Sequence, residues 1–351
     1  KTLSVFFILF LFTLPMVAQT KPALQTGTWR ASLIRKDGVP VVFTIQVTEV
    51  NKKKRLVIKN AEEEIILTNL VIKNDSVNFS TPFFESDFKT QLLPDGSLKG
   101  TWIKGTADGK QYWPFYAYPN QPERFFSAAK KTKNNISGRW AVTITRPNNT
   151  ERPAIAEFTQ KDNYLTGTLL TPSGDARYLE GVVAGDSLLL SAFDGSHIYF
   201  FSARINDNQT IADGIFYSGF AGKEKWVAVK NDGVQLPDVG NTPQLKEGFE
   251  KLDFTFPDIN GKPISINDKR FKNKVVIIQI MGSWCPNCMD ETAFLTDYYK
   301  KNRQRGVEII SLAYELSTDF KRSQITLRKF QQRFKVTYPM LITGVSVSDS
   351  L

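Results

Sequence analysis

The first two thirds of the chain carries one sequence pattern twice. The offset between equivalent residues stays between 111 and 114 positions, which is typical of an internal duplication. Two copies are too few for a solenoid, so we expect two similar domains or two halves of one larger structure. The equivalent segments are 27–29 with 138–140, 71–77 with 182–188, 98–100 with 212–214, and Trp113 with Trp226.

Each copy has the pattern of an all-β structure. Short apolar runs alternate with hairpin turns such as Lys36-Asp37-Gly38 and Pro94-Asp95-Gly96, without a sustained helical period. The pattern predicts antiparallel barrels or sandwiches. The candidate strands of the first copy are 28–34, 41–47, 55–59, 65–72, 77–80, 88–93, 98–103 and 111–118.

Both copies carry a tryptophan in the first expected strand and another in the last. Two interpretations stay open: the indoles fill the core, or they line an aromatic pocket or docking surface. We place the copies at residues 27–118 and 137–230. The turn-rich segment 231–250 is the expected linker to a different kind of domain at 251–351.

The first residues indicate export. A basic residue, Lys1, is followed by an apolar run from Val5 to Phe12 and later by the small residue Ala18. This order predicts a secretory signal peptide over 1–18, cleaved after Ala18, with the mature protein in the periplasm or on the outer-surface side of a bacterial envelope. The alternative is an uncleaved anchor, although the apolar run is short for a membrane span.

Charge and histidine content argue against two classes of function. The net charge of +10 is spread over local clusters such as 52–55, and no nucleic-acid recognition motif accompanies them. The single histidine, His197, is far in sequence from both cysteines, so a zinc or copper ligand set is missing. We therefore expect no nucleic-acid partner, no metal and no cofactor.

The only two cysteines, Cys285 and Cys288, lie where a strand is expected to end and a helix to begin. Residues 274–281 form an apolar run typical of a strand buried on both faces, and 287–303 have helical spacing. A second strand is expected at 307–313 and a second helix at 324–334. A helix N-terminus lowers the pKa of a thiol. A structural disulfide closing so short a loop adds little stability, and a zinc site lacks its other ligands. Redox chemistry is therefore the favoured interpretation.

The surrounding residues resemble a known family. Residues 258–262, the strand at 274–276 and the motif at 282–288 are together similar to the thioredoxin-like TlpA/ResA family of exported thiol-disulfide oxidoreductases. The resemblance begins near Leu252 and covers under a third of the chain. The expected fold is therefore multidomain: a duplicated all-β region followed by an α/β thioredoxin-like domain.

The resemblance implies a role for each residue of the motif. Cys285 attacks the client disulfide, and Cys288 resolves the mixed disulfide, so that the two form a redox disulfide. Trp284 is expected to cover one side of the sulfurs, and Pro286 suits the first turn of a helix. Glu291 matches a family glutamate near the thiols and is a candidate proton-handling group; the alternative is a solvated helix carboxylate.

Two departures from the family pattern stand out. Ala293 occupies a position where members usually carry a proline, which puts the expected helix kink in doubt. The thioredoxin fold also needs a cis-proline facing the dithiol and two further strands. We expect these beyond Leu351, with Pro339 as the weaker candidate for the cis-proline, so the domain at 251–351 is expected to be incomplete at its C-terminus.

The leading hypothesis is an exported oxidoreductase that reduces disulfides in client proteins, with electrons supplied by a membrane thiol-disulfide carrier. Oxidation or isomerisation stays open, because the direction depends on the reduction potential. The alternatives are a ligand- or surface-binding β protein with an auxiliary dithiol and, ranked lower, a thiol peroxidase.

Overall fold

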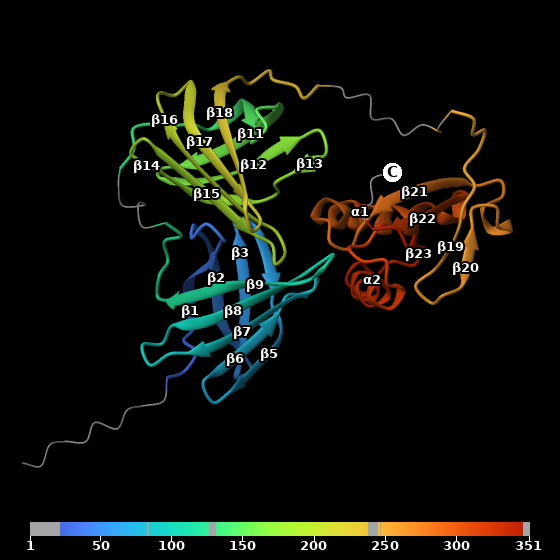
Figure 1. Cartoon of the computed structure of the whole chain (residues 1–351), viewed down its shortest axis with the longest axis horizontal. Helices are drawn as coiled ribbons and strands as arrows, with labels where there is room; N and C mark the ends of the chain where they lie inside the picture. The colour runs from blue at the N-terminus through green and yellow to red at the C-terminus, as the bar shows by residue number, and fades with distance from the viewer. Residues whose placement is uncertain (1–21, 83, 126–130, 238–244, 246, 347–351) are drawn as a thin grey trace, which may run out of the picture.

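The computed structural model describes residues 22–82, 84–125, 131–237, 245 and 247–346. The expected signal peptide at 1–18 lies outside the described residues. Two β units follow each other along the chain, and an α/β unit lies beside them (Figure 1). Among the described residues, no helix is long and apolar enough to cross a membrane.

The first β unit is one antiparallel sheet of nine strands, in the order β4-β3-β2-β1-β9-β8-β7-β6-β5. Buried and exposed side chains alternate along its strands because one face of the sheet covers the core. The sheet is barrel-like, and among the described residues β4 and β5 form its two edges. Its strands are β1 (Gly27–Ile34), β2 (Pro40–Val50), β3 (Lys53–Asn60), β4 (Glu63–Ile66), β5 (Thr68–Lys73), β6 (Ser76–Ser80), β7 (Ser86–Leu92), β8 (Leu98–Thr106) and β9 (Gly109–Pro119).

The single strand expected at 65–72 is wrong. The chain there leaves β4 and enters β5 at the opposite end of the sheet order. Leu67 lies between them with its side chain buried and its N–H donating to the carbonyl oxygen of Leu56. Asn69 adopts a left-handed backbone with φ of 52°, a conformation that a short polar side chain tolerates. An apolar run interrupted by such a residue is easily mistaken for one strand.

The second β unit also has nine strands, in the order β11-β10-β18-β17-β16-β15-β14-β12-β13. An additional pairing of β11 with β12 joins the first strand of this order to the last but one, so the sheet closes into a ring. Its strands are β10 (Gly138–Thr145), β11 (Glu151–Lys161), β12 (Tyr164–Thr171), β13 (Gly174–Asp175), β14 (Leu179–Ala184), β15 (Ser187–Phe193), β16 (Ile198–Ile205), β17 (Thr210–Ser218) and β18 (Gly222–Lys230).

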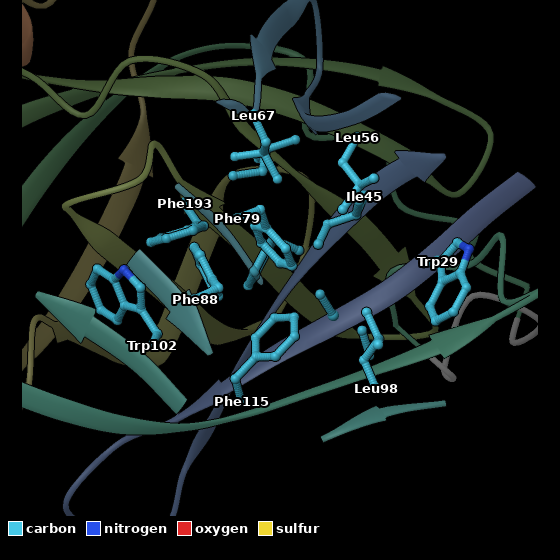
Figure 2. Packing of buried hydrophobic residues seen from close by; sticks show 14 of the residues in the cluster. Trp29, Ile45, Leu56, Leu67, Phe79, Phe88, Leu98, Trp102, Phe115 and Phe193 are labelled. Atoms are coloured by element: carbon cyan, nitrogen blue, oxygen red, sulfur yellow. The ribbon is translucent and has the colours of Figure 1, made fainter. Parts of the chain in front are cut away.

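The tryptophans of both units fill apolar cores. Trp29 and Trp113 are buried in the first cluster, and Trp140 and Trp226 in the second. The core-filling interpretation of these side chains is therefore confirmed. The two units also pack on each other, because Phe193 of β15 enters the first cluster, where its ring lies 5.1 Å from that of Trp102 (Figure 2).

The α/β unit places a strand before each of its two long helices. A hairpin of β19 (Thr255–Pro257) and β20 (Pro263–Ser265) turns at Gly261, which has φ of 82°. A parallel sheet follows in the order β21-β22-β23. The elements are the 3-10 turns η2 (Lys269–Phe271) and η3 (Arg303–Arg305), strands β21 (Val275–Met281), β22 (Val307–Ala313) and β23 (Met340–Ile342), and helices α1 (Pro286–Asn302) and α2 (Phe320–Phe334).

These elements agree closely with the expected strands at 274–281 and 307–313 and the expected first helix. The second helix begins four residues earlier than expected, at Phe320, because the side chain of Asp319 caps it by accepting from the N–H of Arg322 at 2.7 Å. The peptide bond before Pro339 is trans.

Candidate active site

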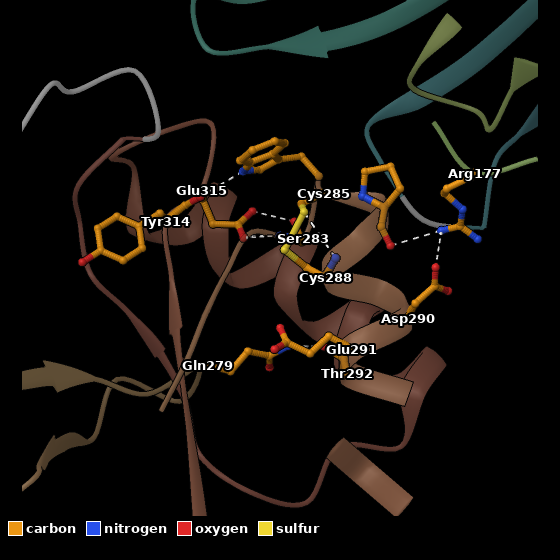
Figure 3. Close-up of a disulfide and its surroundings, with 12 residues drawn as sticks. Arg177, Gln279, Ser283, Cys285, Cys288, Asp290, Glu291, Thr292, Tyr314 and Glu315 are labelled. Carbon is orange, nitrogen blue, oxygen red and sulfur yellow. Dashed lines mark hydrogen bonds and ion pairs between the residues drawn. A yellow bond between two sulfur atoms is a disulfide. The ribbon is translucent and has the colours of Figure 1, made fainter. Parts of the chain in front are cut away.

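Cys285 and Cys288 lie at the N-terminus of α1 and are joined as a disulfide, with their Cα atoms 5.3 Å apart (Figure 3). Cys285 is the N-cap residue, and its sulfur accepts from the N–H of Cys288 at 3.3 Å. Both side chains are half-buried. The backbone N–H of Cys288, in the first turn of α1, therefore points at the Cys285 sulfur, where it stabilises a thiolate once the disulfide is reduced.

Pro286 occupies the first position of α1, as expected from the sequence. Just upstream, Gly282 accepts at its carbonyl oxygen from the N–H of Cys285 at 3.1 Å. A Cβ atom at Gly282 would come within 2.2 Å of the Trp284 indole. This glycine therefore lets the Trp284 ring lie directly against the backbone of the strand-to-helix turn.

Trp284 is held by the end of the neighbouring strand. Its Nε1 donates to the carbonyl oxygen of Tyr314, which directly follows β22, at 2.9 Å. The ring lines a small pocket together with Phe84 of the first β unit and Ser196 of the second. Trp284 thus stands between the α/β unit and the β units, beside the cysteine that it precedes.

Glu315 is a buried carboxyl group that the sequence analysis missed. It accepts from Ser283 twice, from the N–H at 2.8 Å and from Oγ at 2.6 Å, and from Thr326 Oγ1 at 3.0 Å. Burial raises its pKa above the usual range for glutamate, although the hydrogen bonds from Ser283 act in the opposite direction. The sequence signal that could have indicated Glu315 is its position two residues after the apolar run of β22, at the end of a predicted strand.

Glu291 lies on α1 and is exposed to solvent. Its carboxylate accepts at 3.0 Å from the side-chain amide of Gln279, which is buried on β21. The same amide donates to Thr292 Oγ1 at 2.9 Å, and its oxygen accepts from Ser311 Oγ at 2.7 Å. Glu291 is therefore anchored to the strand that leads into the dithiol (Figure 3).

The β units reach the dithiol turn through Arg177, in the loop between β13 and β14. Its Nη1 donates to the carbonyl oxygen of Pro286 at 3.1 Å. The guanidinium also pairs with Glu63 of β4 at 2.8 Å and approaches Asp290 of α1 at 3.6 Å. Arg177 thereby connects both β units to the first turn of α1 (Figure 3). Sequence reasoning did not find it, because these partners are far apart in the chain.

The described residues contain no group of three or more His, Cys, Asp or Glu side chains that could hold a metal ion. His197 lies in the turn before β16, where its Nδ1 is 2.9 Å from Asp194 Oδ2. Burial acts to raise the pKa of the largely buried Asp194, but its interaction with the His197 side chain and the hydrogen bonds from the N–H groups of Ser196 and His197 hold that pKa below its usual range.

The comparisons with known proteins concern the α/β unit. Residues 249–344 match the model of the AhpC/TSA family. The thiol-disulfide oxidoreductase ResA of Bacillus thuringiensis subsp. konkukian (strain 97-27) is 30% identical over 99 residues, which cover 28% of this chain and 53% of that protein. ResA of Bacillus subtilis (strain 168) is 29% identical over 98 residues, with 28% and 50% covered.

The chain thus spans about half the length of the curated relatives it matches. Among solved structures, a thiol-disulfide oxidoreductase from Bacteroides fragilis NCTC 9343 is 15% identical, with 28% of this chain and 69% of that chain covered and a TM-score of 0.24. The resemblance of the C-terminal part of the chain to the ResA family is confirmed by the curated relatives.

Proposed function

We propose that the protein is an exported thiol-disulfide oxidoreductase that reduces disulfides in client proteins through Cys285 and Cys288. The observation that carries the proposal is the half-buried disulfide at the N-terminus of α1, with a backbone N–H directed at the Cys285 sulfur. The ResA relatives support a redox role for this part of the chain.

The chemistry begins from the dithiol form. The Cys285 thiolate attacks one client sulfur, which forms a mixed disulfide and releases the other client sulfur as a thiolate. The Cys288 thiolate then attacks the Cys285 sulfur, so that the Cys285–Cys288 disulfide forms and the second client sulfur leaves. Two electrons pass to the client, whose two thiolates take up the protons. A membrane thiol-disulfide carrier is the proposed donor that restores the dithiol.

Two residues are proposed to support this exchange. Glu291 handles protons near the thiols, and its anchoring to Gln279 supports that role by holding it beside the strand that leads to Cys285. Trp284 shields one side of the sulfurs, in keeping with its fixed position against the end of β22.

We propose that the two β units are copies of one domain, at 27–118 and 137–230, joined by the linker 231–250 to the redox domain at 251–351. Support comes from their first strands, each of which pairs with the second and the last strand of its unit. Trp29 and Trp140 also donate in the same way, each to the carbonyl oxygen four residues earlier. Their proposed role is to position clients at the dithiol.

Insulin reduction by the full chain tests the function. The native protein is expected to turn over insulin with a dithiol as electron source, and Cys285→Ser is expected to abolish turnover. Cys288→Ser is expected to retain the first step and accumulate a mixed disulfide with insulin, detectable by mass. Undiminished turnover by Cys285→Ser would contradict the proposal.

A further inference from the structure

The loop between β13 and β14 contributes a charged group to the dithiol. We infer that Arg177 is a positioning residue that stabilises the Cys285 thiolate, so that the β units tune the reactivity of the redox unit. The inference rests on the proposed function, in which the Cys285 thiolate is the nucleophile. It gives the β units a chemical role that neither the dithiol motif nor the ResA resemblance assigns to them.

The contact is specific in its geometry. Arg177 Nη1 is 3.1 Å from the carbonyl oxygen of Pro286, the residue directly after Cys285. The loop is held in a left-handed turn, with φ of 55° at Arg177 and its N–H donating to Asp175 Oδ1 at 2.9 Å. Only 17% of the Arg177 side chain is exposed. The guanidinium is therefore fixed beside the turn that carries both sulfurs.

Acidic residues surround this turn, so the positive charge of Arg177 affects the stability of the Cys285 thiolate. Asp290 and Glu291 on α1, Glu63 on β4, and Glu315 after β22 are acidic, and each disfavours a thiolate at Cys285 when it is ionised. Burial raises the pKa values of Glu63 and Glu315, which weakens their share of this effect. Arg177 pairs directly with Glu63 and Asp290 and so opposes this field. Partial burial strengthens its effect, because the local dielectric constant is lower than that of water.

The same geometry predicts opposite effects for two single substitutions. Replacing Arg177 with glutamine removes the cation and leaves two carboxylates near the turn, so the thiolate is destabilised. Replacing Glu63 with glutamine removes an anion and leaves Arg177 bound to Pro286, so the thiolate is stabilised. A general loosening of the contact between the units cannot produce shifts of opposite sign.

The experiment measures the alkylation rate of Cys285 by iodoacetamide against pH, in the reduced full-length protein carrying Cys288→Ser. The midpoint of this profile reports the thiol pKa. Arg177→Gln is expected to raise the midpoint by about half a pH unit to one unit. This is a small shift for the loss of a nearby charge, because the carboxylate partners of Arg177 partly neutralise it. Glu63→Gln is expected to lower it, and Arg177→Lys to keep it near the native value.

Arg270→Gln is the control, since it removes an ion-paired guanidinium at the start of β22, the end of the parallel sheet opposite the dithiol, where Arg270 Nη2 lies 3.3 Å from Glu308 Oε2. It is expected to leave the midpoint unchanged. An unshifted midpoint in Arg177→Gln, or equal shifts in Arg177→Gln and Arg270→Gln, overturns the inference while the oxidoreductase proposal stands. The oxidoreductase proposal is tested separately: undiminished insulin turnover by Cys285→Ser would contradict it.

Discussion

Arg322 of α2 and Glu85, just before β7, form a two-nitrogen ion pair across 237 positions of sequence. Nε lies 2.9 Å from Oε1, and Nη2 lies 2.5 Å from Oε2. The same guanidinium donates to the carbonyl oxygen of Thr106 at 2.7 Å. Hydrogen bonding to Glu85 raises the pKa of Arg322. This pair and the Arg177 contact both hold the redox unit against the β units.

Reversing the charge of Arg322 is expected to release this contact. Arg322→Glu places two carboxylates against each other, so the radius of gyration measured by X-ray scattering is expected to rise. The charge swap Glu85→Arg with Arg322→Glu is expected to restore it. In a double-mutant cycle the coupling energy is expected to be about 1 kcal/mol, because both side chains are partly exposed. Lys329→Glu, at an exposed position of α2, is the control. An equal rise in the radius of gyration of Lys329→Glu would show that the Arg322–Glu85 pair is not what holds the units together.

Glu315 is expected to give the unfolding free energy a specific pH dependence. Its folded pKa is raised by burial, so the protonated form favours folding and this contribution is lost as pH rises from the ordinary glutamate value through the raised pKa. Relative to Glu315→Gln, the native protein should lose stability across that window with a slope of at most about 1.4 kcal/mol per pH unit. Urea unfolding of both proteins at several pH values checks this. Plots of unfolding free energy against pH that run parallel for the native protein and Glu315→Gln would contradict the prediction.

Glu291→Gln tests the proton-handling role. The substitution keeps an oxygen that can accept from Gln279 but removes the charge. Insulin turnover is expected to fall by about tenfold, less than the usual contribution of a fully positioned acid–base group because Glu291 is exposed. Asp297→Asn removes a carboxylate from the same helix and is the control. Equal activity of the native and Glu291→Gln proteins would favour a simple solvated carboxylate.

Trp29 and Trp140 are expected to have equivalent roles in stability. Each is almost completely buried, so truncation to alanine is expected to cost about 3–5 kcal/mol in the unfolding of its own unit. Tyr112→Ala, at a side chain that is 60% exposed, should change stability by less than about 0.5 kcal/mol. Denaturant unfolding with tryptophan fluorescence measures all three. A cost below 1 kcal/mol at either tryptophan would argue against its core role.

The sequence predicted the local features of this protein well. Hairpin turns, the apolar strand before Cys285 and the proline at the start of α1 depend on neighbouring residues, and each was found at its expected place. Arg177 and Glu63 could not be predicted as neighbours of the dithiol, because their meeting depends on how the units pack. The break between β4 and β5 was missed because it falls at Leu67, an apolar residue inside an apolar run.

The two β units differ in whether their sheets close. β11 pairs with β12 in the second unit, whereas no strand of the described residues pairs with the outer side of β4 or β5 in the first. Ile66, Val71 and Ile72 beside these edges are about half exposed. Unpaired edges with apolar side chains can recruit strands from other molecules. We therefore expect self-association in concentrated solution to begin at the β4 and β5 edges. The register shift between Thr68 and Val71 is expected to limit the length of β5 that can pair with another molecule.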